Sequence, residues 1–176
     1  FQNNGGVVVG KNARAGANGQ GSGVAIGQDV DARYSGTAIG RNVTATSSST
    51  SVGIGISNTA KSGGIAIGRS ASTSTSGGVA IGSSVNASTS AGVVVGSSST
   101  VSYGGVVLGS NNNSSGNTII GTGNTSGGSY YRGAIIGTNN STTYGGVIIG
   151  VGNEDNRRSG ISIGYYNYSN NYYIYA

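Results

Sequence analysis

The sequence predicts an all-β protein folded as a parallel β-roll, a β-solenoid of about twelve 14-residue coils. Three observations predict it. A glycine-flanked apolar phrase recurs from one end of the chain to the other, a second column of residues follows it at constant distance, and 36 of 176 residues are Gly. Because neighbouring parallel strands lie about 4.8 Å apart, twelve coils predict a rod roughly 55–60 Å long.

The recurring phrase reads Gly-apolar-x-apolar-Gly. Ten copies occupy 6–10, 23–27, 36–40, 64–68, 78–82, 92–96, 105–109, 133–137, 146–150 and 160–164, and degenerate copies occupy 51–55 and 117–121. The closing glycines at 10 and 164 lie eleven repeats apart, a mean spacing of 14 residues. Val and Ile in stretches too short for a helix indicate strands, and glycine pairs mark bends. Each coil is therefore expected to hold two short strands and two turns.

A second column stands three residues after each closing glycine. It reads Ala13, Val30, Val43, Asn58, Ala71, Val85, Ser99, Asn112, Asn124, Asn140, Asn153 and Asn167. In a stack of equivalent coils each of these residues lies above its neighbour, so inward Asn side chains are expected to hydrogen-bond along a ladder. A lone buried Asn would be costly, whereas a stacked one is satisfied.

The first strand of each coil is apolar at three successive positions. We expect the alternate residues, for example Val79 and Ile81, to face the interior and the residue between them, Ala80, to face outward. The central position is also apolar in nine other coils: Val8, Ala25, Ala38, Ala66, Val94, Val107, Ile119, Ile135 and Ile148. A strand that is apolar on both faces is covered on both faces. The outer face is therefore expected to meet another chain, as in a homotrimer.

The composition excludes most catalytic chemistry. The chain has no His and no Cys, so it lacks the nucleophile systems, zinc sites, haem ligands and disulfides that depend on them. We expect no enzyme activity and no cofactor. Asp29 and Asp31 flank inward Val30 at a separation compatible with glycosidase chemistry, but with Arg33 beside them they indicate a solvated patch. A glycan-cleaving solenoid enzyme is a remote alternative.

One thin-cored domain over 1–176 accounts for the length, with coils over about 5–170 and a Tyr-rich terminal segment over 165–176. Only 35% of residues are hydrophobic and 7% charged, and the net charge of +5 is too low to favour disorder. No apolar stretch approaches the ~20 residues of a membrane span. The absence of Met suggests a processed, secreted product.

The segments 22–45 and 63–92, with their Val-Ala-Ile-Gly and Ile-Ala-Ile-Gly phrases, small residue three positions later and 14-residue period, resemble the head repeats of trimeric autotransporter adhesins. The resemblance covers about residues 5–170. It implies a left-handed roll, three chains side by side, and display on a cell surface for attachment to matrix, glycans or cells. The neck motif, heptad stalk and membrane anchor of that family are not recognisable, and the Tyr-rich segment is foreign to it.

Both ends of the roll suggest a second possibility. The first strand begins almost at Phe1, Tyr172 to Tyr175 is itself strand-like, and no polar cap is recognisable. Uncapped coils expose edges that template further pairing. The sequence therefore also predicts a filament subunit that polymerises head-to-tail.

Several surface positions are candidates for binding. Lys11, Arg41 and Arg69 each follow a closing glycine on alternate coils, a basic stripe suited to sulfated glycans or other acidic surfaces. The Tyr-rich segment is expected to form an interface or cap through Tyr165, Tyr166, Tyr168, Tyr172, Tyr173 and Tyr175. Because nine of eleven Tyr lie from Tyr130 onward, remote from that stripe, nucleic-acid binding is not expected.

Other motifs reduce to surface features. Among eight Asn-x-Ser/Thr sequons, Asn42, Asn86 and Asn139 are the outward candidates for glycosylation. Residues 5–12 match the spacing of a phosphate-binding loop, but the spacing belongs to the repeat. Residues 154–158 indicate a charged surface loop. Thr pairs do not form the continuous column of an ice-binding face.

These observations favour a non-enzymatic, extracellular β-roll that is a structural and adhesive element of a surface appendage or fibre. The filament subunit is the alternative, and a phage or virus fibre and an ice-binding solenoid are remote ones. The expected partners are copies of the chain and an extracellular matrix, glycan or cell surface, with no nucleic acid and no membrane insertion.

Overall fold

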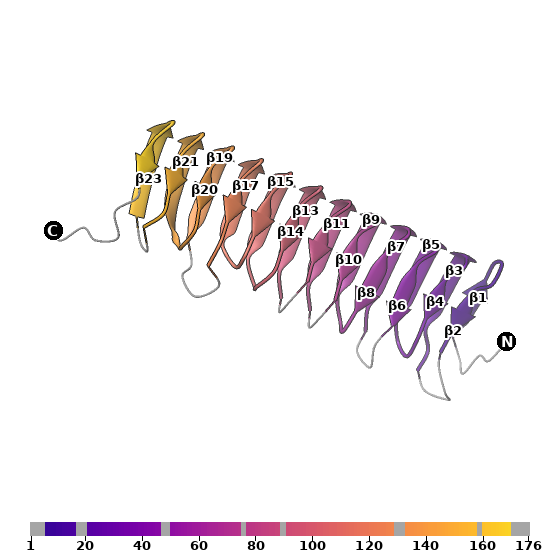
Figure 1. Cartoon of the computed structure of the whole chain (residues 1–176). Helices are drawn as coiled ribbons and strands as arrows, with labels where there is room; N and C mark the ends of the chain where they lie inside the picture. Colours follow the sequence, from indigo (N-terminus) through magenta and orange to yellow (C-terminus); the bar gives the residue numbers. More distant parts are fainter. Residues whose placement is uncertain are drawn as a thin grey trace.

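The computed structural model describes residues 6–16, 21–46, 50–74, 77–88, 91–128, 133–157 and 160–169. Across these residues the chain is all-β, without helix, and its strands form two parallel sheets of twelve strands each. Figure 1 shows the coils stacked in one row, with the first coil at one end and β23 at the other. The predicted parallel β-solenoid of short coils is confirmed.

The odd-numbered strands form the first sheet, here called the odd sheet: β1 Val7–Val9, β3 Val24–Gln28, β5 Thr37–Arg41, β7 Val52–Ile56, β9 Ile65–Arg69, β11 Val79–Ser83, β13 Val93–Ser97, β15 Val106–Ser110, β17 Thr118–Thr122, β19 Ala134–Thr138, β21 Gly146–Val151 and β23 Gly160–Tyr165. They coincide with the repeated phrase. Each pairs with the next odd strand one coil along, and the closing glycines from Gly27 to Gly164 fall in one register.

The even-numbered strands are shorter and form the second sheet, the even sheet: β2 Arg14–Ala15, β4 Asp31–Ala32, β6 Thr44–Thr46, β8 Thr59–Lys61, β10 Ser72–Thr73, β12 Asn86–Ala87, β14 Thr100–Val101, β16 Asn113–Ser114, β18 Thr125–Ser126, β20 Ser141–Thr142, β22 Glu154–Asp155 and β24 Tyr168–Ser169. Each coil thus crosses from an odd strand to an even strand through a tight bend and returns through a longer one.

The two faces of the odd sheet are the reverse of our expectation. Ala80, expected outside, is fully buried, whereas Val79 and Ile81 are half-buried on the outer side. The same holds along the sheet, where the central residue of the phrase fills the interior. In the early coils the interior beside this position is narrow: an added Cβ at Gly53, also central, would contact Val43 from the adjoining bend at 2.7 Å. In the late coils the central residue is a buried Ile, such as Ile135, as large as its outward neighbour Ile136.

Three inward positions fill each coil, and their sizes compensate one another. In an early coil they are Ala25, Val30 and Ala32, all buried. In a late coil they are Ile135, Asn140 and Thr142. The larger inward side chain therefore lies at the bend in the early coils and on the odd sheet in the late coils.

The predicted Asn ladder is present. Asn124 Nδ2 donates to Asn112 Oδ1 at 3.1 Å, and Asn140 Nδ2 donates to Asn124 Oδ1 at 3.0 Å. Each Oδ1 also accepts the backbone N–H of the next Asn, as Asn124 Oδ1 does from Asn140 at 3.0 Å. Each Nδ2 further donates to a closing-glycine carbonyl of the next coil, that of Gly137 for Asn124 at 2.8 Å. The ladder thus supplies the buried amides with partners.

The tight bends depend on a backbone conformation that few residues adopt. Gly96 has φ +145°, and two residues later Ser98 has φ +47°; the same pair of positive values recurs in every coil of the described chain. The left-handed position is occupied mainly by Gly, Asn and Asp, the residues that tolerate it best, and by Ser in four coils. An added Cβ on Gly96 would overlap the carbonyl oxygen of Gly109 in the next coil.

We predict that Gly96→Ala lowers the free energy of unfolding by about 3 kcal/mol or more, because the methyl group forces neighbouring coils apart. Gly77→Ala is the matched control: Gly77 also has positive φ, but nothing lies within 4 Å of an added Cβ. It should cost only about 1 kcal/mol of backbone strain. Urea unfolding followed by circular dichroism measures both, and equal losses would contradict the close-approach explanation.

We also predict that Asn124→Ala lowers stability by about 2–4 kcal/mol, since it leaves several buried partners in neighbouring coils without a hydrogen bond. Asn124→Asp is nearly isosteric but replaces the Nδ2 donor with an acceptor that faces Asn112 Oδ1 and the Gly137 carbonyl. It should be at least as destabilising at pH 7 and recover partly at low pH. A variant as stable as wild type would show that the ladder contributes nothing.

Candidate functional site

The outer side of the odd sheet is the most extensive uniform surface of the described chain. Two columns of outward side chains run along it. The first is Val7, Val24, Thr37, Val52, Ile65, Val79, Val93, Val106, Thr118, Ala134, Val147 and Ile161; the second is Val9, Ile26, Ile39, Ile54, Ile67, Ile81, Val95, Leu108, Ile120, Ile136, Ile149 and Ile163. We call these columns the apolar face. All but Thr37 and Thr118 are apolar.

The apolar face is open to solvent. Ile120 and Ile136, the ninth and tenth of the twelve residues of the second column, are 42% and 44% exposed. Twelve strands about 4.8 Å apart and two side chains across give a patch of roughly 500–700 Å². That is at or above the largest apolar patch of a typical soluble monomer, about 300–600 Å². Exposed apolar patches of this size are typical of interaction sites.

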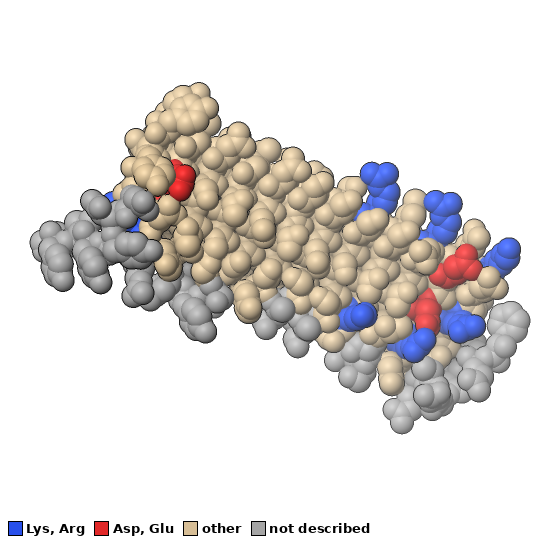
Figure 2. Space-filling model, in the orientation of Figure 1, with Lys and Arg blue, Asp and Glu red and all other residues tan. Residues whose placement is uncertain are grey.

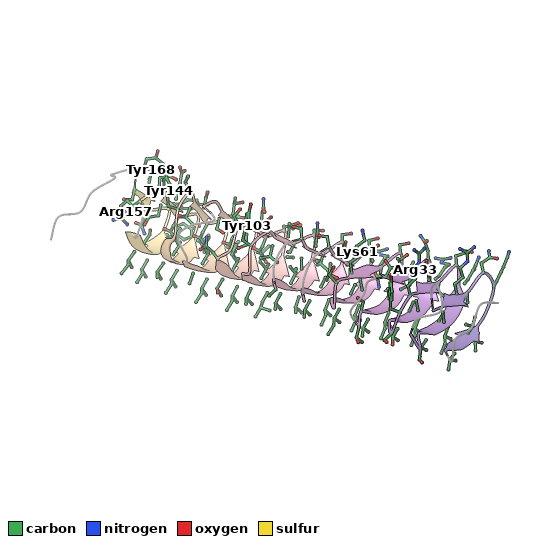
Figure 3. All side chains as sticks on the ribbon, turned by 90° about the horizontal axis from the view of Figure 1, so that it is seen from below. Arg33, Lys61, Tyr103, Tyr144, Arg157 and Tyr168 are labelled. Atoms are coloured by element: carbon green, nitrogen blue, oxygen red, sulfur yellow. The ribbon has the colours of Figure 1, made fainter. Side chains whose placement is uncertain are left out.

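The outer side of the even sheet is polar. Its column over the middle coils contains small uncharged side chains: Thr44, Thr59, Ser72, Asn86, Thr100, Asn113, Thr125 and Ser141. Side chains that carry only carbon project from the odd sheet over much of its length in Figure 3, and oxygen and nitrogen atoms gather on the opposite side. The roll is therefore a slab with one apolar and one polar face.

The basic stripe forms on alternate coils as expected. Arg41 and Arg69 lie two strands apart in one register column with Ile56 between them, and Lys11 occupies the equivalent place in the first coil. All three are exposed, and no described acidic residue pairs with them. Figure 2 shows Lys and Arg gathered toward the N-terminal end. No charged residue occurs between Ser70 and Tyr131.

The terminal tyrosines that the structure describes lie together on the last coil. Tyr165, Tyr166 and Tyr168 are each about two-thirds exposed, and the rings of Tyr165 and Tyr166 meet edge to face at 4.4 Å between centroids. A hydrogen bond and charge interaction with Tyr166 raise the pKa of Tyr165. Tyr172, Tyr173 and Tyr175, also expected in the interface, lie outside the described residues.

The glycosylation candidates differ in accessibility. Asn42 and Asn139 stand at the left-handed bend position and are exposed. Asn86 points outward from β12 but is half-buried, and its Oδ1 is enclosed without a hydrogen-bond partner in the described chain. A glycan is therefore accommodated more readily at the two bend positions.

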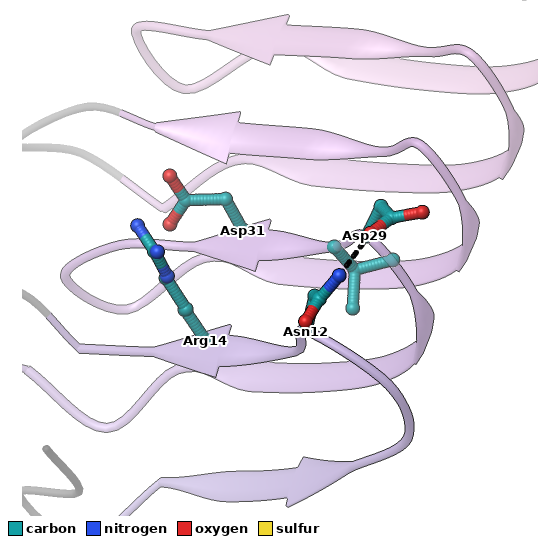
Figure 4. A pocket seen from close by; sticks show the side chains of 5 residues that line it. Asn12, Arg14, Asp29 and Asp31 are labelled. Carbon is teal, nitrogen blue, oxygen red and sulfur yellow. Dashed lines mark hydrogen bonds between the residues drawn. The ribbon is translucent and has the colours of Figure 1, made fainter. Parts of the chain in front are cut away.

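Asp29 and Asp31 line a shallow pocket with Asn12, Arg14 and Val30. In Figure 4 Asp31 lies beside Arg14, whereas Asp29 stands at the bend and accepts a hydrogen bond from Asn12 at 2.8 Å. Arg33 pairs with Asp31 at 2.8 Å, and this hydrogen bond and charge raise the pKa of Arg33. Both carboxylates thus have polar partners, the arrangement of a solvated patch.

The sequence reasoning placed Asp155 on a surface loop, and the structure corrects this. Asp155 is inward, 1% exposed, and its carboxylate accepts hydrogen bonds from Arg157 Nε at 2.9 Å, Nη2 at 2.6 Å and the backbone N–H at 3.0 Å. Burial by itself raises the pKa of Asp155, but these hydrogen bonds and the Arg157 charge bring the pKa below its ordinary value. One signal was available: Asp155 stands five residues after Gly150, a position that is inward in other coils, as at Thr142.

Some site types are not found in the described residues. No group of three His, Cys, Asp or Glu lies close enough together to hold a metal ion. The described residues also contain no helix with the length and hydropathy to cross a bilayer. Comparisons with family models, curated proteins and solved structures found no match to the chain.

We predict that acid weakens the last coils through Asp155. Its folded pKa is below the unfolded value of about 3.9, so the unfolded chain binds the proton at higher pH and the ion pair's contribution is lost as pH falls below about 4. Asp155→Asn should lower the free energy of unfolding by about 2 kcal/mol at pH 7. It should also reduce the loss of stability below about pH 4, which we call the acid limb. The control is Asp31→Asn, which breaks an exposed pair of little energetic value. Urea unfolding from pH 7 to 2.5 measures both; an unchanged acid limb in Asp155→Asn would contradict the assignment.

Proposed function

We propose that this protein is a non-enzymatic, structural and adhesive β-roll of an extracellular appendage or fibre, and that copies of the chain associate side by side through the apolar face. The observation that carries the proposal is the continuity of that face over all twelve strands of the odd sheet. A surface of this length and width has no role in a freely soluble monomer, where it favours aggregation.

The size of the apolar face fits an interface between copies. Two such faces pressed together bury roughly 1,000–1,400 Å², which overlaps the range of stable protein interfaces, about 1,200–2,000 Å². The face is straight and regular, because every coil repeats the same register. Three copies around a common axis, the arrangement that the resemblance to adhesin heads implies, would cover it and leave the polar faces outside.

Adhesion would then use the surfaces that remain exposed. The even sheet presents hydroxyl and amide side chains at regular spacing, and the basic stripe presents cations on alternate coils, about 9.6 Å apart. Repeated weak contacts along a stiff rod sum to strong attachment when the ligand is itself repetitive. Extracellular matrix and acidic glycans on cell surfaces are ligands of this kind.

We predict that Ile120→Lys with Ile136→Lys disrupts the side-by-side assembly, because two ammonium groups would have to be desolvated within the interface. Negative-stain electron microscopy should show rods or filaments several chains wide for wild type and one chain wide for the variant, with unchanged circular dichroism. Thr125→Lys, on the polar face of the coil that contains Ile120, is the matched control and should leave the multimer intact. A monomeric wild type, or a variant that assembles like wild type, would overturn the proposal.

A further inference from the structure

We propose that the two ends of the roll bind each other in successive copies of this chain, so that the last coil of one copy stacks on the first coil of the next in the internal register of the solenoid. The inference rests on the proposed structural role but uses different surfaces from the apolar face. It names the partner, a second copy, and the residues that meet it.

The last coil ends with hydrogen-bonding groups that every earlier coil satisfies by stacking. Glu154 N–H donates to the Asn167 carbonyl at 2.8 Å, and the Val151 carbonyl accepts from Tyr166 N–H at 2.9 Å. The equivalent groups one coil later are Tyr168 N–H and the Tyr165 carbonyl. They have no such partner in the described chain, because β23 and β24 are edge strands.

The Asn ladder also stops unfinished at this end. Asn167 N–H donates to Asn153 Oδ1 at 2.9 Å, which completes the step below it. Its own Oδ1 accepts no hydrogen bond from the described residues, although Asn112, Asn124, Asn140 and Asn153 each accept one from the next coil. The end of the roll therefore presents an acceptor in a fixed position and orientation.

The first coil carries the groups that this end lacks, and the roll contains a template for the junction. Inside the chain, Asn58 is followed in its column by Ala71: Asn58 Oδ1 accepts from Ala71 N–H at 2.8 Å, and Asn58 Nδ2 donates to the Gly68 carbonyl at 2.9 Å. Ala13 and Gly10 of the first coil are the equivalents of Ala71 and Gly68. A coil with Ala at this position thus already stacks on a coil with Asn inside the chain.

Side chains at the two ends are complementary column by column. Extending the register places Tyr165 against Lys11 and Tyr168 against Arg14 of the next copy. These tyrosines are 68% and 66% exposed, and neither cation has an acidic partner within ion-pair distance in the described chain. A cation near an aromatic ring is a favourable contact. In the junction, the cations at the first coil of one copy would thus contact the tyrosines at the last coil of the other.

The apolar face continues across such a junction. Its terminal members are the most exposed: Val7 and Val9 are 50% and 57% exposed, and Ile161 and Ile163 are 66% and 65%. Stacking β23 on β1 would pair Ile161 with Val7 and Ile163 with Val9. Because the two surfaces differ and the stacking adds no closing rotation, the contact is heterologous and produces an open filament. Its axial repeat would be about 58 Å, twelve coils of about 4.8 Å.

The test uses the whole chain of 176 residues and blocks each end of the roll separately. Tyr168→Pro removes the N–H that would bond to the next copy, while the in-chain ladder uses only the carbonyl of the preceding residue. Lys11→Glu with Arg14→Ala removes both cations at the other end. Wild type should form filaments in negative-stain electron microscopy, and both variants should lose them with unchanged circular dichroism.

The matched control is Arg41→Glu with Arg69→Ala, the same change of charge in the third and fifth coils, and it should leave filaments intact. Mixing the two end-blocked variants should give pairs joined once, since each retains one competent end, but no longer filaments. Wild type that forms only discrete rods, or Tyr168→Pro that still forms filaments, would overturn the inference. If the end-blocked variants still associate side by side, the proposed function stands even though this inference fails. The Ile120→Lys with Ile136→Lys variant should lose side-by-side association and still form filaments.

Discussion

The close parallel stacking of one coil on the next is the constraint on which the rest of the structure depends. At each tight bend the closing glycine lies so near the next coil's carbonyl that a side chain there would overlap it. The residue two positions later takes a left-handed conformation and donates its N–H to the preceding coil, as Asp29 does to Lys11 at 2.9 Å. The high glycine content is therefore a requirement of the fold rather than a sign of disorder.

A roll this thin has little apolar interior, and hydrogen bonds between stacked polar side chains add to the stabilisation that the core provides. The early coils fill the interior with Ala and Val, whereas the late coils combine a large Ile with buried Asn, Ser and Thr. Stacking makes such polar interiors possible because each amide finds its partners in the neighbouring coils. Within the described residues, the same property leaves the last rung of the ladder, Asn167, without a following Asn to donate to its Oδ1.

The sequence predicts the architecture well because every coil repeats the same local requirements. It does not predict which side chains of the odd strands point into the roll. The phrase Val79-Ala80-Ile81 is apolar throughout, so periodicity cannot say which residues face inward, and the usual assumption that larger side chains are buried gives the wrong answer. The buried Asp155 was missed because a charged pair near Arg157 looks like a surface loop until its column is aligned with Thr142 in the neighbouring coil.

By itself, the sequence determined the coil length, the position of the bends and the Asn ladder, because glycine geometry and stacking act identically in every repeat. Only the tertiary structure decided which side of the odd sheet is covered, because the covered side is the one that faces the even sheet. It also decided which residues share a column, because Arg14 and Tyr168 stand in one column of the even sheet, at opposite ends of the roll, only once twelve coils share one register.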